Sequence, residues 1–233
     1  MGLFSSCLIR TALAGLPLSM VSASLFAAPI ASAAPPCPDV EVVFARGTFE
    51  PPGVGGTGQA FVDALTRQLG DKSVEVYPVN YPASLDFPRA ADGIIDASNK
   101  IRQTAADCPS TKTVLGGFSQ GAAVAAYITA DSVPANFVLP EGITGPLPAD
   151  VADHVAAVAL FGKPSNGFMN TIQSTAPPIT IGHRYTAKTV EMCVDGDPVC
   201  SADPGDASLH SLYASNGMAD QAASFVAQRV NGR

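Results

Sequence analysis

The pattern of apolar and polar residues along the chain predicts strands and helices in alternation. Residues 40–44 and 155–161 are nearly continuous apolar runs, as expected of strands that are buried on both faces. Residues 113–118 form a third run, which ends in glycines and a serine and then passes into alanines, so we expect a strand, a sharp turn and a helix. Weaker runs at 74–79 and about 186–192 predict two more strands. Pro78 ends the first of these early or places it at a sheet edge.

Helical periodicity occupies the segments between these runs. We expect helices at about 58–69, 88–106 and 211–230, with a Pro- and Gly-rich excursion at 133–148. The inward stripe of the second helix is expected at Ile94, Ser98, Ile101 and Ala105. Strands alternating with helices, without an internal repeat, predict a doubly wound parallel α/β sheet covered on both faces. Such sheets bind ligands at the carboxyl ends of their strands.

The first 33 residues have the pattern of a secretory signal peptide. Arg10 precedes an apolar stretch, and Ala31-Ser32-Ala33 is the small-x-small pattern of a cleavage site. Cleavage after Ala33 would leave residues 34–233, 200 of the 233, which is enough for a single domain. A retained membrane anchor is the alternative, and Gly15 and Pro17 argue against it. We therefore expect a secreted, extracellular or wall-associated monomer without a transmembrane segment in its mature form.

Charge narrows the possible partners. Of 13 Lys and Arg residues, removal of Arg10 leaves 12 against 20 Asp and Glu, a formal charge of −8. This balance argues against nucleic acid and anionic membranes, because phosphate binding draws on clustered Lys and Arg.

Four cysteines remain once Cys7 leaves with the signal peptide, and an even number in an exported chain indicates two disulfides. A turn at 196–198 can bring Cys193 and Cys200 together, which leaves Cys37 to pair with Cys108. A zinc site is the rival interpretation. It is disfavoured because the chain has no Cys-x-x-Cys or His-x-x-x-His spacing.

The candidate nucleophile is Ser119, at the centre of a Gly-Phe-Ser-Gln-Gly segment that matches G-x-S-x-G. This pattern places a serine on a strained turn between a strand and a helix, where its hydroxyl is exposed to a base and to backbone N–H donors. A surface serine in a glycine-rich turn is the alternative, since short motifs have false positives. The decision therefore depends on the partners that the rest of the chain supplies.

A serine nucleophile needs a base, and histidine is the usual one near neutral pH. His154 and His183 lie near strand starts, at the wrong end of the sheet, whereas His210 lies late, before the last helix. In the order Ser, acid, His, the acid falls between Ser119 and His210. Spacing does not separate the four acids that qualify, namely Asp195 and Asp197 inside the cysteine loop and Asp203 and Asp206 after it.

Three segments and one histidine together resemble the cutinase family. They are 43–48 (Val-Phe-Ala-Arg-Gly-Thr), 116–121 (Gly-Gly-Phe-Ser-Gln-Gly) and 193–200 (Cys-Val-Asp-Gly-Asp-Pro-Val-Cys), followed by His210. The resemblance covers essentially the whole mature chain and is greatest to the secreted actinobacterial esterases. It implies a small α/β-hydrolase fold, with three α/β/α layers and a central five-stranded parallel sheet.

The resemblance also assigns roles to residues. It implies a triad of Ser119, Asp197 and His210, with the histidine thirteen residues after the acid. It implies an oxyanion hole from the N–H of Gln120 and the N–H and hydroxyl of Thr48, and the same two disulfides. Two features depart from the family: Phe118 stands where tyrosine is common, and the excursion at 133–148 is longer than in fungal members.

The activity that follows is hydrolysis of short- to medium-chain carboxylic esters, of lipids or of polyesters such as cutin, through an acyl-enzyme. No metal or organic cofactor is needed. The pocket candidates are Leu85, Phe87, Leu209 and Leu212, with ordinary packing as the alternative for each. Two other functions remain open: a catalytically silent binding or surface protein on the same fold, and an acyltransferase or thioesterase.

Overall fold

The centre of the fold is a parallel sheet in the order β2-β1-β3-β4-β5. The computed structural model describes residues 2, 36–135, 137–201 and 205–232, and the proposed signal peptide, apart from Gly2, and Asp203 lie outside them. Within this part of the chain the five strands are β1 (Val40–Ala45), β2 (Val74–Pro78), β3 (Lys112–Phe118), β4 (Val155–Phe161) and β5 (Thr189–Met192). The sequence-based prediction of a parallel α/β sheet is confirmed, and β2, with its Pro78, forms one edge.

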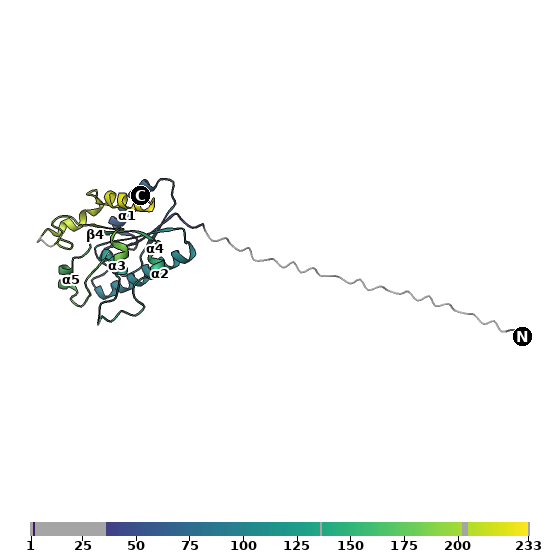
Figure 1. Ribbon diagram of the computed structural model, residues 1–233, viewed down its shortest axis with the longest axis horizontal. Helices are drawn as coiled ribbons and strands as arrows, with labels where there is room; N and C mark the ends of the chain where they lie inside the picture. Colours follow the sequence, from purple (N-terminus) through teal and green to yellow (C-terminus); the bar gives the residue numbers. More distant parts are fainter. Residues whose placement is uncertain (1, 3–35, 136, 202–204, 233) are drawn as a thin grey trace. The chain divides into compact units, whose positions relative to one another are not determined.

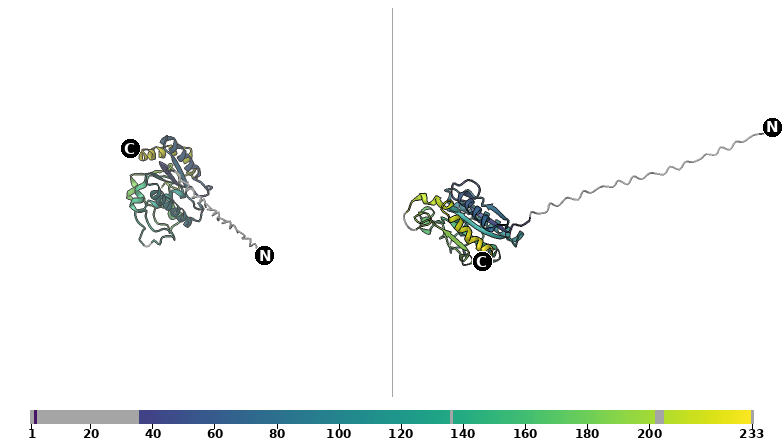
Figure 2. Two further views of the ribbon diagram at one scale, coloured as in Figure 1. Left: turned by 90° about the vertical axis from the view of Figure 1, so that its right-hand side faces the viewer. Right: turned by 90° about the horizontal axis from the view of Figure 1, so that it is seen from above.

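Helices cover both faces of this sheet, which gives three layers (Figures 1 and 2). α1 (Gly55–Leu69) and α7 (Met218–Val230) pack together on one face, while α2 (Ala90–Asp107) and α3 (Gln120–Ile128) lie on the other. The shorter helices are α4 (Ala149–His154), α5 (Asn166–Ile172), α6 (His183–Thr186) and the 3-10 turns η1 (Phe87–Arg89) and η2 (Ala207–Ala214).

Alternation along the strands explains why two layers of helices are needed. In β1, Val42 and Phe44 face the core beneath α1 and α7, whereas Val43 and Ala45 face the core beneath α2 and α3. All six residues of β1 are buried. A strand that is apolar on both faces is stable only when both faces are covered, which is why this segment is a continuous apolar run.

The strand register places the following loops at one edge of the sheet. Ala45 of β1 pairs with Gly117 of β3, and Phe118 of β3 pairs with Phe161 of β4, which in turn pairs with Met192 of β5. The loops that begin at residues 46, 119, 162 and 193 therefore leave the sheet at the same level. This edge holds the residues expected to carry the chemistry.

Two helices differ from the prediction. The expected helix at 211–230 is divided, because Gly217 adopts a φ of 86° and separates η2 from α7. On α2 the buried stripe includes Ala97 and Thr104, while Ile94 and Ala105 are only half-buried. Ile94 is half-buried because it lines a cavity.

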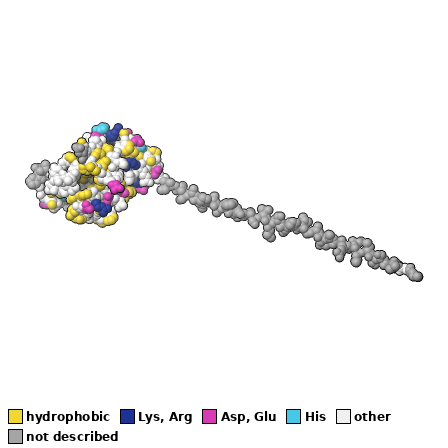
Figure 3. All heavy atoms as spheres, turned by 90° about the horizontal axis from the view of Figure 1, so that it is seen from below, with side chains coloured by type: hydrophobic (Ala, Val, Ile, Leu, Met, Phe, Trp, Pro, Cys, Tyr) yellow, Lys and Arg dark blue, Asp and Glu magenta, His cyan; other side chains and the backbone are white. Residues whose placement is uncertain are grey.

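The structure contains both expected disulfides, Cys37–Cys108 and Cys193–Cys200. In the described part of the chain, no helix is long and apolar enough to cross a bilayer. On the face shown in Figure 3, hydrophobic side chains are gathered beside both acidic and basic ones. Among the large apolar side chains, Phe49, Leu85 and Val138 are the most exposed.

Candidate active site

Ser119 lies at the sharp turn between β3 and α3. Its φ of 54° is in the left-handed region, where a residue with a side chain is strained, and such strain is typical of functional sites. A Cβ on Gly121 would lie 2.0 Å from the carbonyl oxygen of Ala45, and one on Gly117 would lie 2.2 Å from that of Gly121. Glycine is therefore required at both positions for strand and helix to approach this closely. The local sequence thus builds the turn that exposes Ser119.

Ser119, His210 and Asp197 form one chain of hydrogen bonds. The Nε2 atom of His210 lies 2.8 Å from the Oγ atom of Ser119, and its Nδ1 atom lies 2.7 Å from the Oδ2 atom of Asp197. The ring of Phe118 stacks on the imidazole with centroids 4.9 Å apart. A hydroxyl, an imidazole and a carboxylate in this order are the arrangement that activates a serine as a nucleophile.

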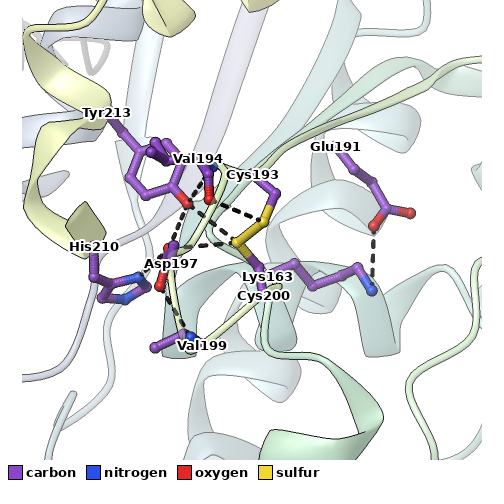
Figure 4. Close-up of a disulfide and its surroundings, with 9 residues drawn as sticks. All are labelled: Lys163, Glu191, Cys193, Val194, Asp197, Val199, Cys200, His210 and Tyr213. Atoms are coloured by element: carbon purple, nitrogen blue, oxygen red, sulfur yellow. Dashed lines mark hydrogen bonds and ion pairs between the residues drawn. A yellow bond between two sulfur atoms is a disulfide. The ribbon is translucent and has the colours of Figure 1, made fainter. Parts of the chain in front are cut away.

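Asp197 is completely buried, and its carboxylate is held from several sides (Figure 4). The Val199 N–H donates to Oδ1 at 2.9 Å, and the Tyr213 hydroxyl donates to Oδ2 at 2.5 Å. The same hydroxyl accepts a hydrogen bond from the Val194 N–H at 3.1 Å. Burial, followed by the hydrogen bond to Asp197, raises the pKa of Tyr213, so its hydroxyl stays a donor.

The disulfide loop supports this carboxylate. Cys193 follows β5 directly, and its bond to Cys200 closes a short loop around Asp197, as Figure 4 shows. A covalently closed turn limits the positions that the carboxylate can take. The imidazole of His210 is therefore oriented by a fixed partner.

The structure distinguishes the three of the four candidate acids that it describes, Asp195, Asp197 and Asp206. Asp195 lies in the same loop as Asp197 but is exposed, and Asp206 caps η2 by accepting the Ser208 N–H at 2.8 Å. Of the other histidines, His154 ends α4 and His183 pairs with Asp131 at an exposed position. Neither joins the hydrogen-bond chain of Ser119.

The loop after β1 carries Thr48 into the cavity that Ser119 and Gln120 also line. The Glu50 carboxylate holds this loop by accepting the N–H groups of Gly47 at 2.6 Å and Gly56 at 2.7 Å. Gln120 is the first residue of α3, where a backbone N–H has no acceptor within the helix. Its side chain donates to the Ser84 carbonyl at 2.9 Å.

Arg46 joins the same loop to the segment that follows β2. Its guanidinium donates to the carbonyls of Glu50 at 2.8 Å and Tyr81 at 2.6 Å, and the Tyr81 hydroxyl donates back to the Arg46 carbonyl at 2.5 Å. The sequence analysis missed the supporting roles of Tyr81, Glu50 and Tyr213. The Ala-Arg-Gly-Thr segment pointed to Thr48, but no local pattern marked the contacts of Arg46 with Tyr81, which lies 35 residues further along the chain.

A cavity of about 480 Å³ opens beside Ser119, and Leu85 and Phe87 line it. Leu209 and Leu212 do not belong to its lining; Leu209 lies near Gly196 of the disulfide loop, and Leu212 is partly exposed. Most of the other lining residues belong to α2, α3, α5, the segment after α5 and the excursion after α3. In the described residues, no group of three or more His, Cys, Asp or Glu side chains is placed to hold a metal ion.

Comparisons with known proteins identify the family of this chain. The sequence model of the Cutinase family matches residues 36–230. The chain is 52% identical over 170 residues to the probable carboxylesterase Culp5 of Mycobacterium tuberculosis, covering 73% of this chain and 95% of that protein. It is 50% identical over 203 residues to the phospholipase Culp4 of the same organism, covering 87% and 83%.

Among solved structures, the chain is similar to a Trichoderma reesei cutinase in complex with a phosphonate inhibitor. The TM-score is 0.61 at 34% identity, covering 84% of this chain and 78% of that one. The five-stranded parallel sheet with helices on both faces is the α/β-hydrolase-like fold of such proteins. The chain belongs to the cutinase family and is a carboxylic ester hydrolase.

Proposed function

We propose that this protein is a secreted serine esterase in which Ser119, His210 and Asp197 transfer an acyl group to water. The observation that carries the proposal is the hydrogen-bond chain from the Ser119 hydroxyl through the imidazole to the buried Asp197 carboxylate. The relatives named carboxylesterase and phospholipase support carboxylic esters, including those of lipids, as substrates.

The reaction begins when the Oγ atom of Ser119 attacks the ester carbonyl while the Nε2 atom of His210 accepts its proton. The negative charge that develops on the carbonyl oxygen is stabilised by the N–H groups of Thr48 and Gln120. The tetrahedral intermediate then breaks the bond to the alcohol oxygen, which takes the proton from His210. Removal of one such N–H donor costs about 10²–10³ in kcat.

Water completes the cycle. His210 accepts a proton from the water that attacks the acyl-enzyme, and the second intermediate collapses to release the carboxylic acid. The proton on His210 returns to the Oγ atom of Ser119. Asp197 stays ionised throughout and stabilises the imidazolium that forms in each half of the cycle.

Export is part of the proposal. Disulfides persist in oxidising compartments outside the cytoplasm, and one of the two disulfides closes the loop that holds Asp197. The proposed signal peptide, residues 1–33, would direct the chain there. Esters of the cell envelope and of secreted or external polymers are then the accessible substrates.

The test measures hydrolysis of p-nitrophenyl butyrate by the oxidised protein and three variants. Ser119→Ala is expected to lose activity by several orders of magnitude. Asp197→Asn and Asp195→Asn are a matched pair in one loop, one position buried and one exposed. Asp197→Asn is expected to lose most activity and Asp195→Asn little. Equal activity in these two variants, or full activity in Ser119→Ala, would contradict the proposal.

A further inference from the structure

The cavity beside Ser119 continues far beyond the reacting atoms, along one face of each of two neighbouring helices. On α2 it is lined by Ala91, Ile94 and Ser98, and on α3 by Ala123 and Tyr127. Residues three, four, seven or eight apart share one side of a helix, so each set forms a continuous strip. The small side chains among them keep a groove open between α2 and α3.

The length of this groove follows from helix geometry. The lining extends from Gln120 at the start of α3 to Ile128 at its end, eight residues further on, which is about 12 Å at the rise of an α-helix. An extended chain advances about 1.2 Å per covalent bond. A groove of this length therefore fits an acyl chain of about ten carbons.

The lining disfavours charged acyl groups. No Asp, Glu, Lys or Arg is found among the described residues that line the cavity. The Tyr127 hydroxyl already donates to the Pro177 carbonyl at 2.6 Å, so its ring presents an apolar surface. Burial raises the pKa of Tyr127 to about 12, which keeps that hydroxyl neutral. The groove therefore suits an aliphatic acyl chain better than a charged one.

A segment of the excursion covers the groove; we call residues 137–147 the cover segment. Phe137, Leu139, Ile143 and Leu147 of this segment line the cavity and are half-buried, whereas Val138 between them is 87% exposed. Its hydrogen bonds are local: the Phe137 N–H donates to the Pro134 carbonyl and the Ile143 N–H to the Pro140 carbonyl. Among the described residues no hydrogen bond joins the cover segment to α2 or α3, so its apolar side chains, directed at the cavity, hold it in place.

We propose that the groove between α2, α3 and the cover segment is the acyl-chain site, and that it makes the enzyme selective for aliphatic acyl groups of about ten carbons. The inference rests on the proposed function, because the chain would be bonded to Ser119 as the acyl-enzyme. The carbonyl lies at Ser119, the acyl chain runs along α3, and the alcohol remains at the open end.

The test measures kcat/KM for p-nitrophenyl esters from acetate to dodecanoate, below the concentration at which they aggregate. For the wild type we expect a rise of up to about fourfold per carbon, the equivalent of ~0.8 kcal/mol for each buried methylene. The rise should begin near butyrate and level off near decanoate, where the groove ends.

Two variants fill the groove at different depths. Ala123 is four residues from Ser119, about 6 Å along the helix, so Ala123→Phe should lower the decanoate-to-butyrate ratio of kcat/KM by at least tenfold. Ser98 lies deeper in the groove, eight residues beyond Ala90 on α2. Ser98→Phe should therefore lower the decanoate-to-hexanoate ratio of kcat/KM and leave the hexanoate-to-butyrate ratio unchanged. Ala106→Phe is the matched control on α2, at an exposed position outside the lining, and should keep all ratios of the wild type.

The outcomes separate this inference from the proposed function. One contradicting outcome is that butyrate is hydrolysed but kcat/KM does not rise with chain length. Another is that Ala123→Phe and Ser98→Phe both have the same kcat/KM ratios as Ala106→Phe. In either case the groove is not the acyl site, and the esterase proposal stands. If no ester is hydrolysed and a fluorophosphonate does not label Ser119 of the folded protein, both fail. Thermal unfolding of each variant identifies one that does not fold, in which case the other carries the test.

Discussion

Replacement of Tyr213 by phenylalanine would test whether the buried hydroxyl positions the triad. The ring of Tyr213 is fully buried against Phe118 and His210, and phenylalanine keeps this packing while removing one oxygen. The Oδ2 atom of Asp197 then loses the hydrogen bond from the Tyr213 hydroxyl and keeps the one to His210. The Val194 N–H loses its acceptor as well.

The expected magnitudes follow from these contacts. A hydrogen bond to a charged group is worth about 1.5–3 kcal/mol, so Tyr213→Phe should lower the free energy of unfolding by about 2 kcal/mol. In a domain of this size that corresponds to a fall in Tm of roughly 4–8 °C. Because Asp197 becomes less constrained but the cavity is unchanged, kcat should fall about tenfold while KM stays within about twofold.

Tyr185→Phe is the matched control. Tyr185 is also buried, and in the described part of the chain its hydroxyl has no hydrogen-bond partner. Removing this hydroxyl should leave both kcat and stability close to those of the wild type. The assay is steady-state hydrolysis of p-nitrophenyl butyrate together with urea unfolding of each protein. A Tyr213→Phe enzyme that is destabilised but keeps the wild-type kcat would refute the positioning role and leave Tyr213 a structural residue.

Three further predictions concern the loop after β1, the disulfides and the buried tyrosines. Glu50→Gln replaces one carboxylate oxygen that accepts a backbone N–H by an NH₂ group, which cannot accept it. The loop that carries Thr48 is then held less firmly, and kcat for ester hydrolysis should fall about tenfold. The control Glu75→Gln, at an exposed position on β2, should have the kcat of the wild type. Replacing Cys37 and Cys108 by serine opens a loop of 71 residues and should lower the free energy of unfolding in urea by about 4 kcal/mol. The same change at Cys193 and Cys200, separated by 7, should lower it by about 2.5 kcal/mol but abolish most of the esterase activity. If the first pair of changes cost more activity than the second, the role of the loop around Asp197 would be contradicted. Burial raises the pKa of Tyr127 and Tyr185 to about 12, above the value near 10 of unfolded tyrosine, so the folded state retains protons that the unfolded state loses. The free energy of unfolding should therefore fall as the pH rises from 10 to 12, by at most about 1.4 kcal/mol per pH unit for each tyrosine. An equal free energy of unfolding in urea at about pH 11.5 and about pH 9 would contradict this prediction.

The fold was largely predictable because its signals are long and local. Continuous apolar runs such as 155–161 become strands with the same bounds, and their alternation with helices implies parallel pairing. The helices that escaped prediction, α4, α5 and α6, have four to seven residues, too few for a 3.6-residue period to stand out. The division at Gly217 was missed because a single glycine also occurs inside continuous helices.

The site was predictable only where residues are close in sequence. The turn around Ser119 was predictable because the two positions that require glycine, 117 and 121, lie within one pentapeptide. The choice of Asp197 over Asp195 depends on which carboxylate points inward after the disulfide forms, and spacing alone does not specify that direction. Tyr213 and Glu50 act through contacts with side chains and N–H groups that no local pattern marks.

The most direct measurement of the central claim is detection of the acyl-enzyme itself. The oxidised protein would be mixed with p-nitrophenyl butyrate, quenched in acid during the first turnovers, and its peptides analysed by mass spectrometry. The mechanism predicts a butyryl group on the Oγ atom of Ser119 that is absent from Ser119→Ala. Turnover of the ester with no acyl group on Ser119, or with the acyl group on another residue, would contradict it.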